Sequence, residues 1–525
     1  AEHVALILVP ISWLYQLWPD PRLLLGIHQL ALALLGWPLF VLARRALSSD
    51  AQALVVLACF YLTPSLAGVA LDDFHAVPIA TVPLAVGLAL VLTGRPQLGA
   101  AIALLALPME EETALAVGGL GALLWARRQR LLGMLVGSAA LVWLATMVFV
   151  VMPRFHDPRT LDTVDGNRTL HHFEEIRAEP AKIADRLLGE RGRDAAVWLG
   201  LPTGGLALLS PSTLLVGAPT FAVLFLQDRD DTFGRHWVVP VTVALWFATA
   251  LGLARLPRGG RRSAGIGLLV AGTALSYVLV SPLPGGGRFD AAALETDERT
   301  YLLERAVQQV PEGAVVVASP NVVAHLANRA EAYVFPIDSH YAQGLGWRRK
   351  RPDFYVLDLA DELTSRVTVS ERLNPLEADR PFHIWSPGRK VLVLSDEEPR
   401  PSHPLDARYG DRLLLKGYDV ERTPDGTLVR LYWERYDTLR GRYDRELTVL
   451  NQEGETVLYE FDMALSSTYG SNKWKPGQTI VDEVLVPPAE GLLTLRIGWV
   501  AQDKRRPFLL ADGSEAFDLV LPGDR

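Results

Sequence analysis

The first 285 residues alternate between long apolar runs and short polar gaps, whereas the remaining residues carry most of the charge. The runs are rich in Leu, Ala, Val and Gly and predict membrane-spanning helices. They cover residues 4–18, 23–43, 51–70, 76–93, 97–109, 113–126, 131–152, 195–209, 212–226, 236–254 and 264–282. A full span needs about 20 apolar residues. The runs that reach this length are 23–43, 51–70, 131–152, 236–254 and 264–282.

Four shorter runs form two pairs. These pairs are 97–109 with 113–126, and 195–209 with 212–226. They predict tight hairpins or broken helices, which a membrane tolerates only where protein or a water-filled cavity shields the backbone. Charge favours a hairpin for 97–126, because one long helix would hold Glu110–Glu112 mid-membrane, at about 2.5–3.5 kcal/mol for each charge.

The polar gaps between the runs alternate in charge. One set holds a single acid, Asp50, and ten arginines: Arg44, Arg45, Arg95, Arg127, Arg128, Arg130, Arg255, Arg258, Arg261 and Arg262. The other set holds Asp72, Asp73 and His75, and then Glu110–Glu112. Short loops rich in Arg stay cytoplasmic. We therefore expect a multi-pass protein of the bacterial inner (plasma) membrane, with the acids, the histidines and everything after residue 283 on the exterior, periplasmic side.

The first run, 4–18, must end outside at Pro19-Asp20-Pro21 and has only about 15 residues. It is either an ordinary span that starts inside or a re-entrant helix at the exterior face, and we favour the re-entrant helix. The start at Ala1-Glu2-His3 has no basic region and no cleavage site, so it is not a signal peptide. We expect the sequence to be N-terminally truncated, without its first span and first exterior loop.

After Pro284–Gly287 the periodicity changes and the chain reads as soluble. An amphipathic helix is expected over 297–310, with Tyr301, Leu302, Ala306 and Val310 on one face. Strands are expected at 314–318, 332–335 and 354–358, with a short helix over 320–328. From residue 411, short alternating strands and Gly-containing turns predict an antiparallel β-sandwich.

The predicted fold class is therefore a polytopic α-helical membrane domain followed by a small α/β domain and a C-terminal antiparallel β-sandwich. The predicted boundaries are 1–285 for the membrane domain, with about nine to eleven hydrophobic segments, 286–400 for the α/β domain and 401–525 for the β-sandwich. The 525 residues have a formal net charge of −8, and basic residues gather on no soluble stretch, so nucleic-acid binding is not expected. No Walker A motif, Rossmann glycine signature, CxxC pair, HExxH or GxSxG elbow occurs.

Two polar clusters lie in the exterior gaps. Asp72-Asp73-Phe74-His75 places carboxylates beside an imidazole at the membrane boundary, where they bind a divalent cation, relay a proton, or merely solvate a helix end. Glu110-Glu111-Glu112 places three carboxylates in an apolar stretch. Their repulsion favours raised pKa values or a bound cation. The alternative is a solvated helix N-terminus that the helix dipole favours.

A third candidate is Arg235-His236-Trp237, at the entry to a membrane run. A guanidinium and an imidazole beside an interfacial Trp suit an anionic phosphate headgroup. Arg and Trp also anchor ordinary helices at the interface. His171-His172 and Glu2-His3 are further possible ligand pairs, although surface pairs of this kind commonly have no function.

Taken in order, these residues resemble a bacterial family of polytopic membrane proteins of unknown function that carries a DFH motif. Asp73-Phe74-His75 matches that motif, Glu111-Glu112 stands where the family has Lys-Glu-Asp, and Arg235-His236-Trp237 stands where it has His-Tyr before a span. Val310–Ser319, His325–Arg329 and Tyr333–Pro336 are similar to its post-membrane α/β segment. The resemblance covers about residues 1–360. Two departures are Glu110 in place of the family's lysine, and the absence of the acid that follows its DFH-Pro.

Members of this family resemble the GT-C glycosyltransferases. The resemblance therefore implies a GT-C-like membrane domain that takes a sugar from a lipid-linked donor, a polyprenyl-phosphate carrier, on the exterior face among membrane lipids. The implied catalytic residues are Asp73, His75, Glu111 and Glu112, and the implied substrate-binding residues are Arg235, His236 and His3. The implied cofactor is a divalent metal ion, held by Asp73, His75 and Glu111. In GT-C enzymes the catalytic base is an acid of the first exterior loop, which we expect upstream of this chain.

The alternative hypothesis is a non-catalytic membrane protein, either a transporter or a scaffold that displays the soluble domains. A transporter is expected to contain paired broken helices related by an inverted repeat. The two broken pairs predicted here show no sequence likeness to each other.

Overall fold

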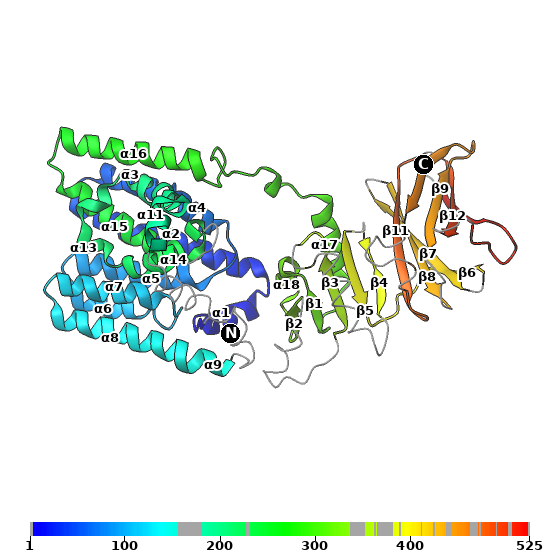
Figure 1. Cartoon of the computed structure of the whole chain (residues 1–525), viewed down its shortest axis with the longest axis horizontal. Coiled ribbons are helices and arrows are strands. Elements are labelled where there is room, and N and C mark those ends of the chain that lie inside the picture. The colour runs from blue at the N-terminus through cyan, green and yellow to red at the C-terminus, as the bar shows by residue number, and fades with distance from the viewer. Residues whose placement is uncertain are drawn as a thin grey trace. The chain divides into compact units, whose positions relative to one another are not determined.

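The computed structural model describes residues 4–155, 181–226, 232–335, 352–361, 364, 382–387, 390–410, 412–423, 426–436, 443–462, 471, 474–489, 491–501 and 507–522. These residues form two compact units, one helical and one rich in strands (Figure 1). The first ends at Glu295 and the second begins at Thr296. This arrangement agrees with the predicted fold class of an apolar helical half followed by antiparallel sheets.

The helical unit consists of α-helices joined by short 3-10 and π-helical turns. Its long elements and their neighbours are α1 Leu8–Leu17, α2 Pro21–Leu47, α3 Asp50–Tyr61, α4 Pro64–Ala70, α5 Ala76–Leu92, α6 Pro96–Leu104, α7 Thr113–Ala126, α8 Arg130–Thr146, η1 Met147–Val151 and α9 Met152–Phe155. They are followed by α11 Ala181–Leu188, α12 Glu190–Ala195, η2 Ala196–Gly200, η3 Leu201–Thr203, η4 Leu206–Leu209, α13 Pro211–Leu214, α14 Ala218–Leu226, η5 Thr232–Gly234, η6 His236–Val238, α15 Val239–Arg255, α16 Gly260–Val280 and η7 Ala292–Leu294.

Among the described residues, four helices are long and apolar enough to cross a membrane: Pro21–Leu47, Arg130–Val151, His236–Arg255 and Gly260–Val280. A fifth span is possible if α3 and α4, which meet at a bend of 56°, act as one. These five correspond to the five runs that the sequence marks as long enough. The bend falls at Thr63-Pro64, where proline starts α4 and the Thr63 hydroxyl donates to the Cys59 carbonyl.

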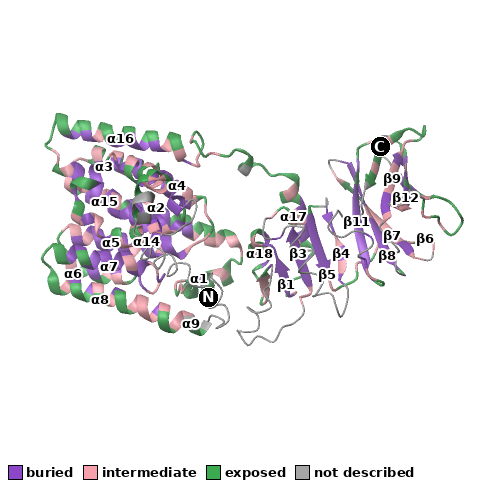
Figure 2. Cartoon of the chain, in the orientation of Figure 1, coloured by how far each residue is buried: buried purple, intermediate pink, exposed green. Residues whose placement is uncertain are grey.

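Burial separates inner from outer helices (Figure 2). Each candidate span contains an apolar stretch of 18 residues, and the buried share of this stretch differs between the helices. It is 78% in His236–Arg255, 17% in Arg130–Val151 and 28% in Gly260–Val280. The outer faces of α8, η1 and α16 expose large apolar side chains, among them Leu135, Leu141, Phe149, Leu275 and Val278. Such surfaces are stable only against lipid or another apolar partner, which agrees with a membrane protein.

The helices α5 to α8 pack as two antiparallel hairpins through glycines. A Cβ atom on Gly87 of α5 would lie 2.5 Å from the Gly99 carbonyl oxygen of α6. A Cβ atom on Gly133 of α8 would lie 2.6 Å from the Gly121 carbonyl oxygen of α7. Only glycine permits such close backbone approach.

The arginines of the inner gaps meet at one end of this unit, here called the arginine end. Arg262 donates to the Leu47 carbonyl (3.4 Å) and Arg258 to the Ser48 hydroxyl (3.5 Å), while Arg127 and Arg255 are electrostatic neighbours. A 27-residue helix such as α2 is about 40 Å long, so its N-terminal turns lie far from Leu47.

Helix direction places Glu110–Glu112 at the opposite end. Helix α5 begins beside His75, α6 returns antiparallel to α5, and α7 runs away to Arg127 at the arginine end. The turn between α6 and α7 therefore lies at the end where α5 begins. The hairpin predicted for 97–126 is confirmed.

Helix α1 has only ten residues, about 15 Å of helix, which is half of what a span needs. The backbone amides of Val4 and Leu6 donate to Glu111 (2.7 Å) and to the Pro108 carbonyl (3.1 Å), both at the α6–α7 turn. Helix α2 begins at Pro21, at that same end. Both ends of α1 thus lie at one end of the unit, as in the re-entrant alternative.

Residues 196–226 form the broken segment that the sequence predicts, and neighbouring spans shield it. The hydroxyls of Thr273 and Ser276 in α16 donate to the Pro202 (2.8 Å) and Val197 (2.6 Å) carbonyls. A Cβ atom on Gly272 would lie 2.2 Å from the Leu201 carbonyl oxygen. These hydroxyls supply hydrogen bonds to carbonyl groups that would be paired within a regular α-helix. Backbone that is not helical needs such partners at membrane depth, because no water is there to replace them.

The second unit contains two helices and two sheets. Its elements are α17 Glu298–Gln308, β1 Val316–Ala318, α18 Pro320–Leu326, β2 Ala332–Val334, β3 Phe354–Asp358, β4 His383–Trp385, β5 Val391–Ser395, β6 His403–Tyr409, β7 Leu413–Thr423, β8 Gly426–Arg435, β9 Tyr443–Leu450, β10 Thr456–Asp462, β11 Thr479–Val486, β12 Leu492–Ala501 and β13 Ala516–Pro522. The predicted helices and first strands are present. On α17, Leu302 and Ala306 are buried as expected. Tyr301 is 46% exposed, so the prediction that it lies on the same face as these two residues was wrong.

One sheet of nine strands, in the order β2-β1-β3-β5-β4-β11-β8-β7-β6, runs through both predicted soluble domains. Strands β1, β2 and β3 are parallel, and β4 pairs in parallel with β11 through Ile384 and Ile480. Along β1 and β3, one set of alternate side chains packs against α17 and α18. The other set packs into the hydrophobic core that is shared with the remaining strands. A second sheet, β10-β9-β12-β13, packs against the nine-stranded sheet around buried Trp433 and Trp499.

Candidate functional site

Two segments far apart in sequence meet where α4 ends and α15 begins. Helix α4 leads into the loop Leu71–His75, and η5 and η6 lead from Thr232 to Val238. A Cβ atom on Gly68 of α4 would lie 2.6 Å from the Gly234 carbonyl oxygen. This backbone contact requires glycine and brings the loop after α4 against Arg235 and His236.

Asp72 is the centre of the group that results, here called the Asp72 cluster: Asp72, His75, Arg235 and His236. The Arg235 Nη1 donates to Asp72 Oδ1 over 2.7 Å. His236 Nδ1 lies 3.2 Å, and His75 Nε2 3.8 Å, from Asp72 Oδ2. The Asp72 side chain is only 6% exposed, whereas that of Arg235 is 52% exposed. One carboxylate oxygen thus binds the guanidinium and the other faces both imidazoles.

Burial alone would raise the pKa of the Asp72 carboxyl. Hydrogen bonds from His236 and Arg235, with the positive charges of Arg235 and His75, outweigh burial and hold that pKa well below its usual range. Asp72 is therefore ionised at neutral pH, and His236 Nδ1 carries the hydrogen that it donates.

His28, fully buried in α2, supports this loop from behind. Its Nε2 donates to the Val69 carbonyl (3.0 Å), and its Nδ1 accepts from the His75 backbone amide (3.2 Å). Both contacts fit one neutral tautomer, with hydrogen on Nε2. His28 therefore fixes the position of His75 without entering the cluster.

The two imidazoles of the Asp72 cluster are stacked. Their ring centroids are 3.2 Å apart and their planes differ by 17°. Ligand atoms of Asp72, His75 and His236 all lie within 4.8 Å of one another, and in the described part of the chain they form a group with the composition of a metal site. His236 and Asp72 have nearly buried side chains, and the His75 side chain is one third exposed.

The residues singled out from the sequence divide into three groups. His75, Arg235 and His236 come together, but their acid is Asp72, and the exposed Asp73 is not in the group of three ligands. Glu111 is buried and accepts from Val4 at the α6–α7 turn, with the half-buried Glu112 beside it, so Glu111 is also outside that group. His3, like His171-His172, lies outside the described residues.

The model of one family matches residues 1–378, which include the helical unit and the Asp72 cluster. That family is described as "Predicted membrane protein (DUF2079)". The chain belongs to this family. The resemblance expected from the DFH motif is confirmed at the level of a membrane protein family of unknown function. No curated protein and no solved structure matches the chain.

Two residues of this DUF2079 chain were missed by sequence reasoning as site residues. Asp72 stood beside the chosen Asp73, and no spacing rule separates two adjacent acids in a loop. His28 stood unmarked in the apolar run 23–43. An ionisable residue inside a membrane segment is by itself a sign of function or of a specific partner, and that sign would have found His28.

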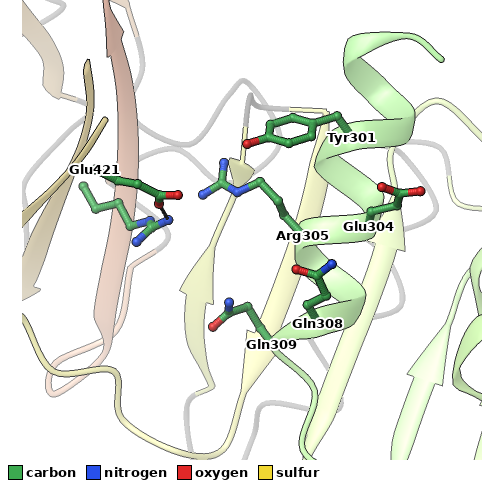
Figure 3. Close-up of a pocket in the computed structure, with 7 residues that line it drawn as sticks. Tyr301, Glu304, Arg305, Gln308, Gln309 and Glu421 are labelled. Atoms are coloured by element: carbon green, nitrogen blue, oxygen red, sulfur yellow. Dashed lines mark hydrogen bonds and ion pairs between the residues drawn. The ribbon is translucent and has the colours of Figure 1, made fainter. Parts of the chain in front are cut away.

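A separate polar pocket of about 340 Å³ lies in the second unit of the DUF2079 chain, beside α17 (Figure 3). Its lining residues are Tyr301, Glu304, Arg305, Gln308, Gln309, Glu421 and Arg430. Two of these residues, Arg305 and Arg430, donate to the Glu483 carboxylate, each over 2.9 Å, and Arg430 also pairs with Glu421. The two guanidinium charges are thus matched by carboxylates. This network joins α17 to β8 and β11.

Proposed function

We propose that this membrane protein transfers a sugar from a polyprenyl-phosphate carrier, with the Asp72 cluster as the subsite for the carrier's phosphate. The observation that carries the proposal is the half-exposed Arg235 guanidinium held by a buried, ionised Asp72 next to two imidazoles. The likeness of the DFH-motif family to GT-C glycosyltransferases supplies the reaction class.

Position also supports the proposal. The Asp72 cluster and the Glu110–Glu112 turn lie at the end of the helical unit opposite the arginine end. By the positive-inside rule the arginine end faces the cytoplasm, so the cluster would face the exterior side of a bacterial inner membrane. A lipid-linked substrate reaches such a site laterally, with its phosphate at the level of the headgroups.

The chemistry requires a stabilised leaving group. An acceptor hydroxyl oxygen attacks the anomeric carbon, the bond from that carbon to the phosphate oxygen breaks, and the electron pair leaves with the polyprenyl phosphate. Negative charge grows on the phosphate during this step, and a preorganised guanidinium stabilises it. Arg235 donates to Asp72 through Nη1, and its other N–H groups are assigned to the phosphate. Attack opposite the leaving group inverts the anomeric carbon.

The acceptor hydroxyl must also lose its proton. Exposed Asp73 and half-buried Glu112 are the carboxylates of this end that we assign to proton acceptance and to shaping the site. Asp72 is a positioning residue, because it holds Arg235 and His236 rather than the reacting atoms.

The test uses the full chain in lipid nanodiscs with radiolabelled polyprenyl-phosphate sugars and cell-envelope acceptors. We expect release of polyprenyl phosphate, a loss of at least tenfold in Arg235→Gln, and partial retention in Arg235→Lys, which keeps the charge but not the fork. If the wild-type chain neither binds nor consumes any of these donors, the proposal is wrong. Movement of an intact donor across a vesicle membrane would instead favour the transporter.

A further inference from the structure

We propose that Asp72, His75 and His236 bind one first-row transition metal ion, with Zn²⁺ the best match. The inference goes beyond the transferase proposal and does not need it to be correct. Two imidazole nitrogens and one carboxylate oxygen are a donor set that suits Zn²⁺ and similar ions, whereas Mg²⁺ and Ca²⁺ prefer oxygen ligands alone.

The distances fit such an ion. Two ligand atoms bound to tetrahedral Zn²⁺ at 2.0–2.2 Å lie about 3.3–3.6 Å apart. Asp72 Oδ2 lies 3.2 Å from His236 Nδ1 and 3.8 Å from His75 Nε2, one value on each side of that range. Because all three atoms lie within 4.8 Å of one another, the widest pair has to close by about 1.2–1.5 Å at most.

Only one ring has to move. A metal ion lies near the plane of each imidazole that binds it, so two stacked rings cannot share an ion until one turns. The His75 side chain is one third exposed, whereas that of His236 is nearly buried and contacts both Asp72 and the Trp237 ring, so His75 is the ring that we expect to turn. His28 fixes the His75 backbone amide and leaves the imidazole to adjust.

The surrounding contacts resemble the outer shell of a metal site. Arg235 binds Asp72 Oδ1 and leaves Oδ2 directed at the imidazoles. Partners of this kind orient a ligating carboxylate. When an ion binds, the hydrogen on His236 Nδ1 passes to solvent, and the lone pair that this frees binds the metal. Three protein ligands leave a fourth position for a water or phosphate oxygen.

The experiment measures metal content without any substrate. The untagged full chain is stripped with chelator in detergent and equilibrated with Zn²⁺, and bound Zn²⁺ is measured by mass spectrometry and calorimetry. We expect about one Zn²⁺ per wild-type chain and binding at least tenfold weaker in Asp72→Asn and His236→Ala. Asp73→Asn is the matched control, because it removes an adjacent exposed carboxylate, and it is expected to bind as wild type does.

Two further measurements decide cases in which a variant folds poorly. His75→Ala changes the more exposed ligand and is expected to weaken binding with little effect on folding. X-ray absorption of the Zn²⁺-loaded wild-type chain should show scattering from two imidazoles. Equal Zn²⁺ binding by wild type, Asp72→Asn and His75→Ala, or binding of Mg²⁺ but not Zn²⁺, overturns the site. Bound Zn²⁺ without sugar transfer would overturn only the transferase proposal.

Discussion

Replacing Asp72 by Asn tests whether this residue, rather than its neighbour, organises the cluster. The amide keeps the shape but loses the charge that Arg235 (2.7 Å) and His236 (3.2 Å) recognise. A hydrogen bond to a charged group contributes about 1.5–3 kcal/mol. In Asp72→Asn, the half-exposed Arg235 guanidinium can bind water and keeps the amide oxygen as a neutral acceptor, so the free energy lost at this hydrogen bond lies at the low end of that range. The amide N–H₂ then faces the His236 N–H, and these two donors cannot form a hydrogen bond with each other. The expected destabilisation is about 2–4 kcal/mol.

The assay is thermal unfolding of the full chain in one detergent with chelator present, so that bound metal does not contribute. For a unit of this size, we expect Tm to fall by roughly 4–10 °C, with faster unfolding where the reaction is irreversible. Asp73→Asn is the control, and as an exposed substitution it should change stability by less than about 0.5 kcal/mol. Equal shifts in Asp72→Asn and Asp73→Asn would refute the placement of Asp72.

Three other predictions concern the rest of the chain. Glu483→Ala leaves the two arginines that it binds without their shared carboxylate, so the second unit should lose about 2–3 kcal/mol, a partly solvated case of a broken buried pair, measured by hydrogen exchange in β11. Gly272→Ala puts a Cβ atom 2.2 Å from a carbonyl oxygen of the broken segment and should cost about 1–3 kcal/mol in thermal unfolding, whereas Gly267→Ala, with open space, should cost nothing. Burial alone would raise the pKa of the Asp419 carboxyl, but hydrogen bonds, chiefly from Tyr432, outweigh burial and lower that pKa. Its stabilisation of the second unit is therefore complete above about pH 4 and is lost as pH falls below that value, so Asp419→Asn should reduce the loss of stability measured from about pH 4 to about pH 2, and an unchanged pH profile would contradict it.

The membrane half could be predicted because its signals are local or additive. Run length identified the four candidate spans and the bent pair α3–α4 among the described residues, and the cost of charge in lipid selected the hairpin around Glu110–Glu112. The alternation of arginine and acid gaps predicted two chemically distinct ends, which the contacts of Arg262 and Asp72 now show. None of these inferences needed to know which segments touch.

The rest depends on contacts between distant segments. Asp72 and Asp73 have the same neighbours in sequence, and only the approach of Arg235, 163 residues away, distinguishes them. The parallel pairing of Ile384 with Ile480 joins strands that each read as ordinary local pattern. The helical period of the apolar residues placed Tyr301 on the buried face of α17. In the structure the sheet covers only a narrower stripe of this helix, which includes Leu302 and Ala306 and leaves Tyr301 exposed.

The central claim is that the Asp72 cluster serves a reaction on a polyprenyl-phosphate sugar. The most direct measurement is sugar transfer from a radiolabelled polyprenyl-phosphate donor by the full chain in proteoliposomes, compared with Asp72→Asn and Asp50→Asn. Asp50 is an exposed carboxylate that pairs with Arg44 at the arginine end, so its substitution controls for loss of an acid elsewhere. We predict transfer by wild type and Asp50→Asn and a loss of at least tenfold in Asp72→Asn. Equal transfer by all three, or transfer no greater than in empty vesicles, would contradict the claim.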